Sequence, residues 1–111
     1  AIRRVTRDHS LVENLVEQGE ITREQARVHP QKNLITRALG VDRTVQEDLF
    51  ELNNMGGYLL LCSDGLSNIV TDEELRREVV AEDKAGCCQR LLRLALERGA
   101  PDNVTAVLVQ L

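Results

Sequence analysis

The chain has 111 residues, a net charge of −4 at pH 7 and 42% apolar residues, which favours one globular unit with a single modest core. Its aromatic residues are Phe50 and Tyr58 alone, and its basic residues are scattered, so neither a stacking platform nor a basic patch for nucleic acid is present. No apolar run is long enough to span a membrane. We therefore expect neither nucleic acid nor a membrane as a partner. The three cysteines, at positions 62, 87 and 88, lack metal-ligand spacing and are typical of buried, reduced thiols in a cytoplasmic protein.

The first quarter of the chain predicts a strand followed by two short helices. Residues 2–6 have the composition of a short strand. Ser10 opens a helix through a Ser-x-x-Glu capping box with Glu13, and Gly19 ends it. The same capping pattern, starting at Thr22, predicts a second short helix.

The middle of the chain predicts a hairpin. Residues 34–39 fit a strand or a helix equally well, and Gly40 ends the element in either case. Residues 45–52 alternate weakly and suit a half-exposed strand. The pair Gly56-Gly57 forms a turn into the apolar strand 58–62, so the two strands are expected to pair.

Two helices and a strand complete the pattern. A third capping box, opened by Thr71, predicts a helix over residues 72–80. Apolar residues at i, i+1, i+4, i+5 and i+8 from Cys87 predict an amphipathic helix that stops near Gly99. Residues 104–111 are apolar on both faces and should form a strand inside a sheet. The order of elements indicates an α+β fold with mostly antiparallel pairing.

Two acids lie at the ends of two of these strands. Asp64 directly follows strand 58–62, and Asp102 comes just before the last strand. If the strands are antiparallel, both carboxylates reach the same edge of the sheet, and if they are parallel, the carboxylates lie at opposite edges. With Gly65 and Asn103 beside them, two converging carboxylates suit Mg²⁺ or Mn²⁺. The alternative is that both acids serve only the turns in which they lie.

Four stretches, in one order along the chain, resemble motifs of a known family. The sequence is similar to the bacterial metal-dependent protein serine/threonine phosphatases, the protein phosphatase 2C-like (PPM) family, at residues 6–12 (TRDHSLV), 29–40 (HPQKNLITRALG), 59–66 (LLLCSDGL) and 101–105 (PDNVT). The resemblance extends over essentially all 111 residues. No single motif would suffice, since Asp-Gly and Asp-Asn pairs are common in turns.

The resemblance implies the C-terminal half of a four-layer α-β-β-α sandwich with mainly antiparallel sheets. The family's N-terminal motifs, which supply a phosphate-binding arginine and further metal-binding acids, are not visible. Residues 1–111 are therefore expected to be the C-terminal part of a catalytic domain whose N-terminal part is absent. Such a part would leave one sheet face uncovered, so that it binds its missing half or self-associates.

The resemblance also implies the chemistry of the intact enzyme. Two Mn²⁺ or Mg²⁺ ions activate a water that attacks the phosphorus of phosphoserine or phosphothreonine, with no catalytic residue beyond the metal ligands. Asp64 and Asp102 would be metal ligands, while Gly65 and Asn103 would support the loops. The isolated chain should be inactive. The expected partners are phosphoproteins, including serine/threonine kinases of the same cell.

The stretch 29–40 resembles part of the mobile flap beside the family's active site. Four of its residues are candidates for the substrate side: His29, Lys32, Asn33 and Arg37. A plain turn role for His29 and a solvated surface role for the two basic residues are the alternatives. A noncatalytic regulatory or interaction domain with the same fold, or a generic α+β binding module, are the alternative functions. Loss of the metal-binding acids would favour the regulatory domain, but both acids are present. A lack of divalent-cation binding once the other half is supplied would favour the binding module.

Overall fold

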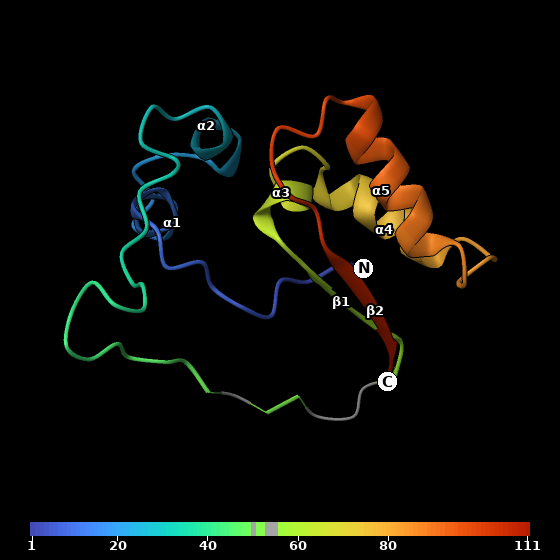
Figure 1. The fold of residues 1–111 in the computed structure, drawn as a ribbon, viewed down its shortest axis with the longest axis horizontal. Helices are drawn as coiled ribbons and strands as arrows, with labels where there is room; N and C mark the ends of the chain where they lie inside the picture. The colour runs from blue at the N-terminus through green and yellow to red at the C-terminus, as the bar shows by residue number, and fades with distance from the viewer. Residues whose placement is uncertain (50, 53–55) are drawn as a thin grey trace. The chain divides into compact units, whose positions relative to one another are not determined.

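In the computed structural model of the chain, residues 1–49, 51–52 and 56–111 are described (Figure 1). They form two compact units, one made of Leu52–Leu111 with Ala1–Arg3 and the other of Arg4–Glu51. None of the helices in these residues is long and apolar enough to cross a membrane.

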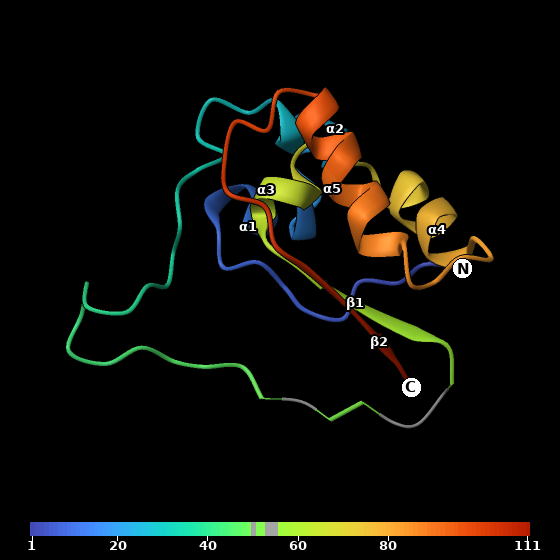
Figure 2. The ribbon, with the colours of Figure 1, turned by 45° about the vertical axis from the view of Figure 1, so that its right-hand side comes forward.

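The larger unit is built on one pair of strands and three helices. Its elements are β1 (Tyr58–Cys62), α3 (Asp64–Ser67), α4 (Asp72–Val80), α5 (Cys87–Glu97) and β2 (Ala106–Gln110). The two strands pair antiparallel along their whole length. Figures 1 and 2 show α4 and α5 on the same side of this strand pair.

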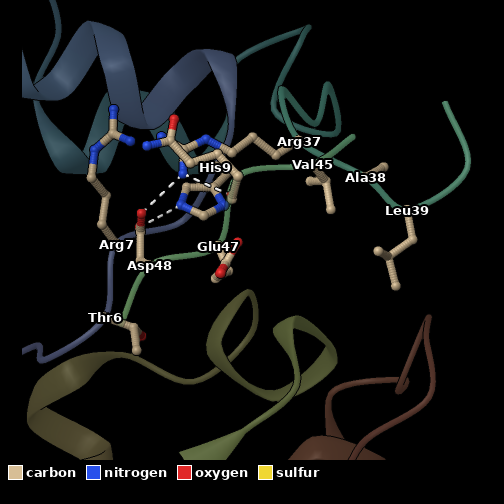
Figure 3. Close-up of a pocket in the computed structure, with 10 residues that line it drawn as sticks. Thr6, Arg7, His9, Arg37, Ala38, Leu39, Val45, Glu47 and Asp48 are labelled. Carbon is tan, nitrogen blue, oxygen red and sulfur yellow. Dashed lines mark hydrogen bonds and ion pairs between the residues drawn. The ribbon is translucent and has the colours of Figure 1, made fainter. Parts of the chain in front are cut away.

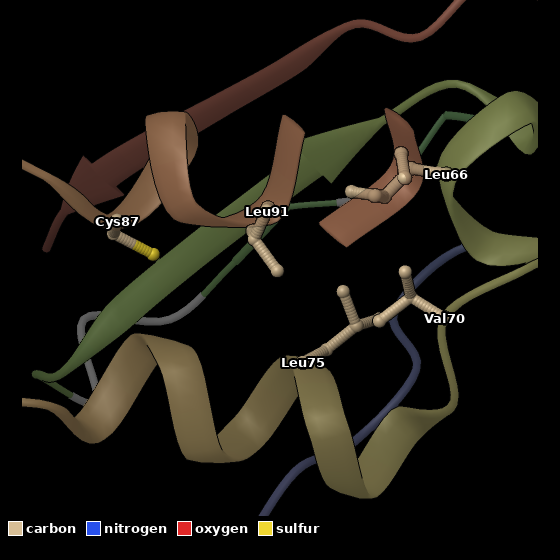
Figure 4. Packing of buried hydrophobic residues seen from close by; sticks show 6 residues of the cluster. Leu66, Val70, Leu75, Cys87 and Leu91 are labelled. Atoms are coloured by element: carbon tan, nitrogen blue, oxygen red, sulfur yellow. The ribbon is translucent and has the colours of Figure 1, made fainter. Parts of the chain in front are cut away.

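The core of the larger unit lies between the helices and one face of the sheet. Because residues four apart share a helix face, α5 buries Cys87, Leu91 and Ala95 together. The remaining core residues come from α3, α4 and the turn between them: Leu66, Val70 and Leu75 (Figure 4). From the sheet, Leu60, Ala106 and Leu108 pack against this cluster. Each fully buried leucine stabilises the fold by roughly 1.5–3 kcal/mol.

The other face of the sheet is apolar and exposed. Since side chains alternate along a strand, Leu61, Val107 and Val109 point away from the helices. Their exposed fractions are 51%, 51% and 38%. The expectation that the last strand is internal to a sheet is wrong for the described residues, in which β2 has β1 as its one neighbour. The strand is also shorter than predicted, because it begins at Ala106 rather than at residue 104.

The two long helices form where the sequence predicts them. The Thr71 capping box is complete and α4 spans residues 72–80. α5 starts at Cys87, and Gly99 follows its end with φ +93°, a backbone conformation that glycine adopts without strain. The short helix α3 has no counterpart in the sequence prediction.

A network of hydrogen bonds ties the start of α4 to the end of α5. Arg98 donates to the Glu74 carboxylate at 2.6 and 2.8 Å, and to the Ile69 carbonyl at 2.8 Å. Glu74 also accepts from the Thr71 N–H at 2.8 Å as part of the capping box. The Arg98 hydrogen bond, followed by the Thr71 backbone bond, lowers the pKa of Glu74 to about 2.

The smaller unit contains α1 (Leu11–Glu17) and α2 (Arg23–Arg27) with their connecting loops. The Ser10 hydroxyl caps α1 by accepting from the Glu13 N–H at 3.2 Å. The reciprocal half of this capping box is not formed, because the Glu13 carboxylate pairs with Arg23 at 3.0 Å instead. The capping box predicted for α2 is complete.

Three segments predicted as extended or ambiguous do not form strands. Residues 2–6 contain no strand, and neither do the described residues of 45–52, of which position 50 lies outside the description. The expected hairpin is therefore wrong, and β1 pairs with β2 instead. Residues 34–39 are neither helix nor strand, although Ile35 makes an isolated antiparallel bridge to Ser10. A short apolar run becomes a strand only where a partner meets its backbone groups, and a local pattern does not identify that partner.

The lowered pKa of Glu74 predicts a loss of stability in acid. A carboxylate whose folded pKa lies near 2, below its ordinary value of 4.5, contributes stability that is complete above pH 4.5 and lost as the pH falls towards 2. Thermal melts followed by circular dichroism should show a steeper fall in Tm over this range for the wild type than for Glu74→Gln. At neutral pH, the Glu74→Gln chain should melt at the lower temperature.

Glu73→Gln is the matched control, because Glu73 is an exposed acid in the same helical turn. It should keep the pH dependence of the wild type. Parallel melting curves for the wild type and Glu74→Gln between pH 5 and 2 would show that this ion pair does not link the two helices.

Candidate metal-binding edge

Antiparallel pairing brings the two predicted acids to one edge of the sheet. Cys62, the last residue of β1, lies opposite Ala106, the first residue of β2. The chain leaving β1 therefore runs beside the chain that enters β2. Asp64 is the first residue of α3, and Asp102 lies in the loop before β2. Of the two arrangements left open by the sequence, the structure has the one that places both carboxylates at the same edge.

A glycine allows the two segments of this edge to touch. Gly65 is buried, and a Cβ atom built on it would lie 2.0 Å from the carbonyl oxygen of Asn103 and 2.9 Å from its carbonyl carbon. Any side chain at position 65 would have to push the loop before β2 away from α3. The approach of Gly65 to Asn103 thus sets how close the Asp64 and Asp102 backbones come.

A serine that sequence reasoning did not single out also joins the two segments. The Ser63 N–H donates to the Thr105 carbonyl at 2.9 Å, which extends the pairing of β1 and β2 by one residue. The Ser63 hydroxyl donates to the Asn103 carbonyl at 3.3 Å. The signal in the sequence is a hydroxyl residue placed between a strand and the acid that follows it.

The two carboxylates differ in their partners. Asp102 and Asp64 are both exposed. The Asp102 carboxylate accepts from the adjacent Asn103 N–H at 2.7 Å, which orients it within the loop. The Asp64 carboxylate has no hydrogen-bond or ion-pair partner among the described residues. A role confined to its turn would engage this carboxylate with a nearby backbone N–H, so the structure gives no support to that role for Asp64.

The donor set at this edge fits part of a site for a hard divalent cation. Two exposed carboxylates are oxygen ligands of the kind that Mg²⁺ and Mn²⁺ prefer. Among the described residues, no group of three or more His, Cys, Asp or Glu side chains is placed to hold a metal ion. The edge therefore offers two candidate ligands, and any further ligands would have to come from water or from other protein segments.

The cysteines do not contribute to this edge as a cluster. Cys87 is buried, and burial raises the pKa of its thiol. Cys88 is half-buried and Cys62 is exposed at the end of β1, so the expectation of three buried thiols is right for Cys87 alone. The three residues form no disulfide.

The four residues expected on the substrate side all lie in the smaller unit. Lys32 and Asn33 are exposed on the turn that follows α2. The His29 ring supports that turn, because its Nδ1 atom accepts from the Gln31 N–H at 3.0 Å. Arg37 is half-buried and donates to the Asp48 carboxylate at 2.9 Å. Within the unit, Arg37 is thus held by an acid, whereas Lys32 and Asn33 face solvent.

A cluster of charged side chains around Asp48 was not predicted from the sequence. The Asp48 carboxylate lies 2.6 Å from Nε2 of His9 and 2.9 Å from the Arg37 guanidinium (Figure 3). The His9 hydrogen bond, and then that of Arg37, lower the pKa of Asp48. The cluster borders a cavity of about 390 Å³ that also has apolar walls from Ala38, Leu39 and Val45. The sequence separation of 39 residues between His9 and Asp48 hides this pair from any local pattern.

The chain is similar to bacterial serine/threonine protein phosphatases over nearly its whole length. No protein-family model matches the chain. The protein phosphatase PhpP of Streptococcus pneumoniae is 41% identical over 110 residues, which is 96% of this chain and 44% of PhpP. The crystal structure of the serine/threonine phosphatase Stp1 from Staphylococcus aureus matches with a TM-score of 0.92 and 43% identity, over 100% of this chain and 44% of Stp1. The catalytic domain of PstP, solved with two manganese ions, matches with a TM-score of 0.73 and 40% identity, over 94% of this chain and 43% of that domain. The chain thus spans less than half the length of these relatives.

Substitution of Gly65 should open this edge. In Gly65→Ala, the new Cβ would collide with the Asn103 carbonyl, so we expect a loss of about 1–3 kcal/mol in the free energy of unfolding. The amide resonances of residues 102–105 should shift in NMR spectra. Helix propensity alone predicts the opposite sign, because alanine favours a helix over glycine.

Gly99→Ala is the matched control. Its Cβ would meet nothing within 4 Å, and its cost comes only from a backbone φ of +93°. It should perturb the end of α5 and leave residues 102–105 unshifted. Stabilisation by Gly65→Ala, with unchanged resonances for residues 102–105, would contradict the close approach.

Proposed function

We propose that this chain, a homologue of the bacterial serine/threonine protein phosphatases, is the C-terminal part of a metal-dependent catalytic domain that dephosphorylates phosphoserine and phosphothreonine in proteins. The observation that carries the proposal is the pair of exposed carboxylates, Asp64 and Asp102, at one edge of an antiparallel strand pair. Similarity to a protein phosphatase over 96% of the chain supports the proposed dephosphorylation reaction. The two manganese ions in the PstP structure support the proposal that the cofactor is a pair of Mn²⁺ or Mg²⁺ ions.

Each residue of the edge has a distinct part in the proposed site. Asp64 presents an unengaged carboxylate to the cation, and Asp102 presents a carboxylate whose direction is set by the Asn103 N–H. Because it has no side chain, Gly65 allows α3 to approach the loop before β2, and Asn103 supports that loop through its backbone. When bound, a pair of divalent cations would lower the pKa of a water and offset the charge of the phosphoryl oxygens.

The uncovered sheet face supports the proposal that the chain is one part of a larger domain. Leu61, Val107 and Val109 expose a continuous apolar surface on the side opposite α4 and α5. Contiguous apolar patches of this kind usually mark an interface. We propose that the N-terminal part of the domain covers this face and supplies the remaining metal ligands. Self-association through the same face is the alternative for the isolated chain.

The smaller unit is proposed to contribute the substrate side. Lys32 and Asn33 are exposed on a turn whose shape His29 supports, so they are available to a phosphoprotein. Arg37 is engaged by Asp48 and would act by holding its segment in place. The expected substrates include serine/threonine kinases of the same cell. The absence of disulfides is consistent with the proposed cytoplasmic location.

Loss of either carboxylate should remove activity while preserving the fold. In the full-length protein, Asp64→Asn and Asp102→Asn each keep the side-chain volume and remove an anionic ligand. We expect turnover of a phosphopeptide to fall by more than about 100-fold, since even changes outside the ligand set of a metal cost 10–100-fold. Titration calorimetry should show weakened Mn²⁺ binding, and Tm should stay within a few degrees.

Glu73→Gln serves as the control for a lost surface carboxylate, and its activity should equal that of the wild type. Asparagine favours the same turns as aspartate, so a role limited to turns predicts that both variants stay active. Full turnover and unchanged Mn²⁺ affinity in both variants would refute the metal assignment.

The 111-residue chain by itself should show no appreciable turnover of an aryl phosphate ester in Mn²⁺. Its described residues place two acids at the edge, which is too few to hold a pair of cations. Addition of the separately produced N-terminal part should restore activity if the two parts associate. Turnover by the chain alone at the rate of a complete family member would show that the site needs no further segment.

A further inference from the structure

Ser63 lies where the chain passes from a strand into a helix. It directly follows β1 and directly precedes α3, whose first residue is Asp64. Its N–H donates to the Thr105 carbonyl at 2.9 Å, as in an ordinary antiparallel pair. The Thr105 N–H, however, donates to the Ser63 hydroxyl at 3.0 Å.

The Ser63 hydroxyl is the acceptor because the Ser63 carbonyl is already used at the start of α3. Residues in a hydrogen-bonded antiparallel pair normally exchange both backbone bonds, so the Ser63 carbonyl would accept from Thr105. That carbonyl instead accepts from the Leu66 N–H at 3.1 Å, and more weakly from Ser67 at 3.4 Å, which begins α3. The serine hydroxyl therefore takes the place of the carbonyl in the strand pairing.

The hydroxyl also acts as a donor to the other segment. It donates to the Asn103 carbonyl at 3.3 Å, the same oxygen that lies against Gly65. A serine hydroxyl has one proton and two lone pairs, so these two bonds use the proton and one lone pair. The single side chain thus fastens Asn103 and Thr105, the two residues that flank Val104 in the approach to β2.

We infer that Ser63 is a positioning residue for the carboxylate pair, and that its hydroxyl sets the separation of Asp64 and Asp102 required to bind a divalent cation. The inference rests on the proposed function of these two acids as metal ligands. Because the hydroxyl completes the strand pairing, the chain can turn into α3 at once and still keep the partner segment attached. Asp64 then stands directly at the sheet edge, beside the loop that carries Asp102.

The test compares Ser63→Ala with Ser63→Thr in the full-length protein. Without metal, amide hydrogen exchange of Thr105 should be about fivefold faster in Ser63→Ala, which is the effect of losing one hydrogen bond of about 1 kcal/mol. The Mn²⁺ affinity should fall by a similar factor of about five. Activity should recover at saturating Mn²⁺, because both ligands remain. Threonine retains a hydroxyl and should restore both the exchange rate and the affinity.

Ser10→Ala is the matched control, since it removes a hydroxyl that accepts one backbone N–H, that of Glu13 in the smaller unit. It should leave Thr105 exchange and Mn²⁺ affinity unchanged. If Ser63→Ala does not fold, Ser63→Cys carries the same comparison, because a thiol is similar in shape but a weak hydrogen-bond partner.

Two outcomes would overturn the inference. Unchanged Thr105 exchange in Ser63→Ala would show that the hydroxyl does not hold the partner segment. Faster exchange with unchanged Mn²⁺ affinity would show that the hydroxyl holds the segment without positioning the ligands. Either result leaves the metal assignment intact as long as Asp64→Asn weakens Mn²⁺ binding, so failure of the inference is distinct from failure of the proposed function.

Discussion

The edge that carries the two aspartates depends on the contact between the Gly65 backbone and the Asn103 carbonyl. Antiparallel pairing of β1 and β2 brings the two segments to the same end of the sheet, but pairing alone leaves their spacing open. The missing side chain at position 65 allows backbone to approach backbone, and the Ser63 hydroxyl donates a hydrogen bond to the same carbonyl. The backbone positions of the two aspartates are therefore set by backbone packing, which is stiffer than a pair of mobile side chains.

Within the larger unit, α4 and α5 pack against one side of the sheet (Figures 1 and 2). α5 packs on β2, whose Ala106 and Leu108 lie against the core cluster that contains Leu91, while the Arg98–Glu74 bonds hold the start of α4 to the end of α5. The outer face, with Leu61 and Val107, contributes apolar surface without a cover in the described residues. A layered architecture explains both observations, because an apolar sheet face is stable in water only when a second layer buries it.

The smaller unit is organised on a different principle. Its two helices are short, and the described residues between 37 and 49 contain no helix or strand. Side-chain hydrogen bonds and ion pairs hold its loops together, as in the contacts of Asp48 with His9 and Arg37. Segments with few backbone ladders and few buried apolar contacts lie at the low end of local stability.

The sequence by itself determined the features whose causes lie within a few residues. The capping box at Thr71, the apolar spacing of α5 and the two acids beside their strands all follow from local pattern, and the family resemblance identified the function of the relatives. Tertiary structure alone decided that β1 pairs with β2 rather than with the segment before it, and that Ser63 and Asn103, 40 residues apart, share a hydrogen bond. Strand pairing and loop contacts use backbone groups that every residue has. A local sequence pattern therefore does not identify which strand pairs with β1, and packing of the whole unit selects β2.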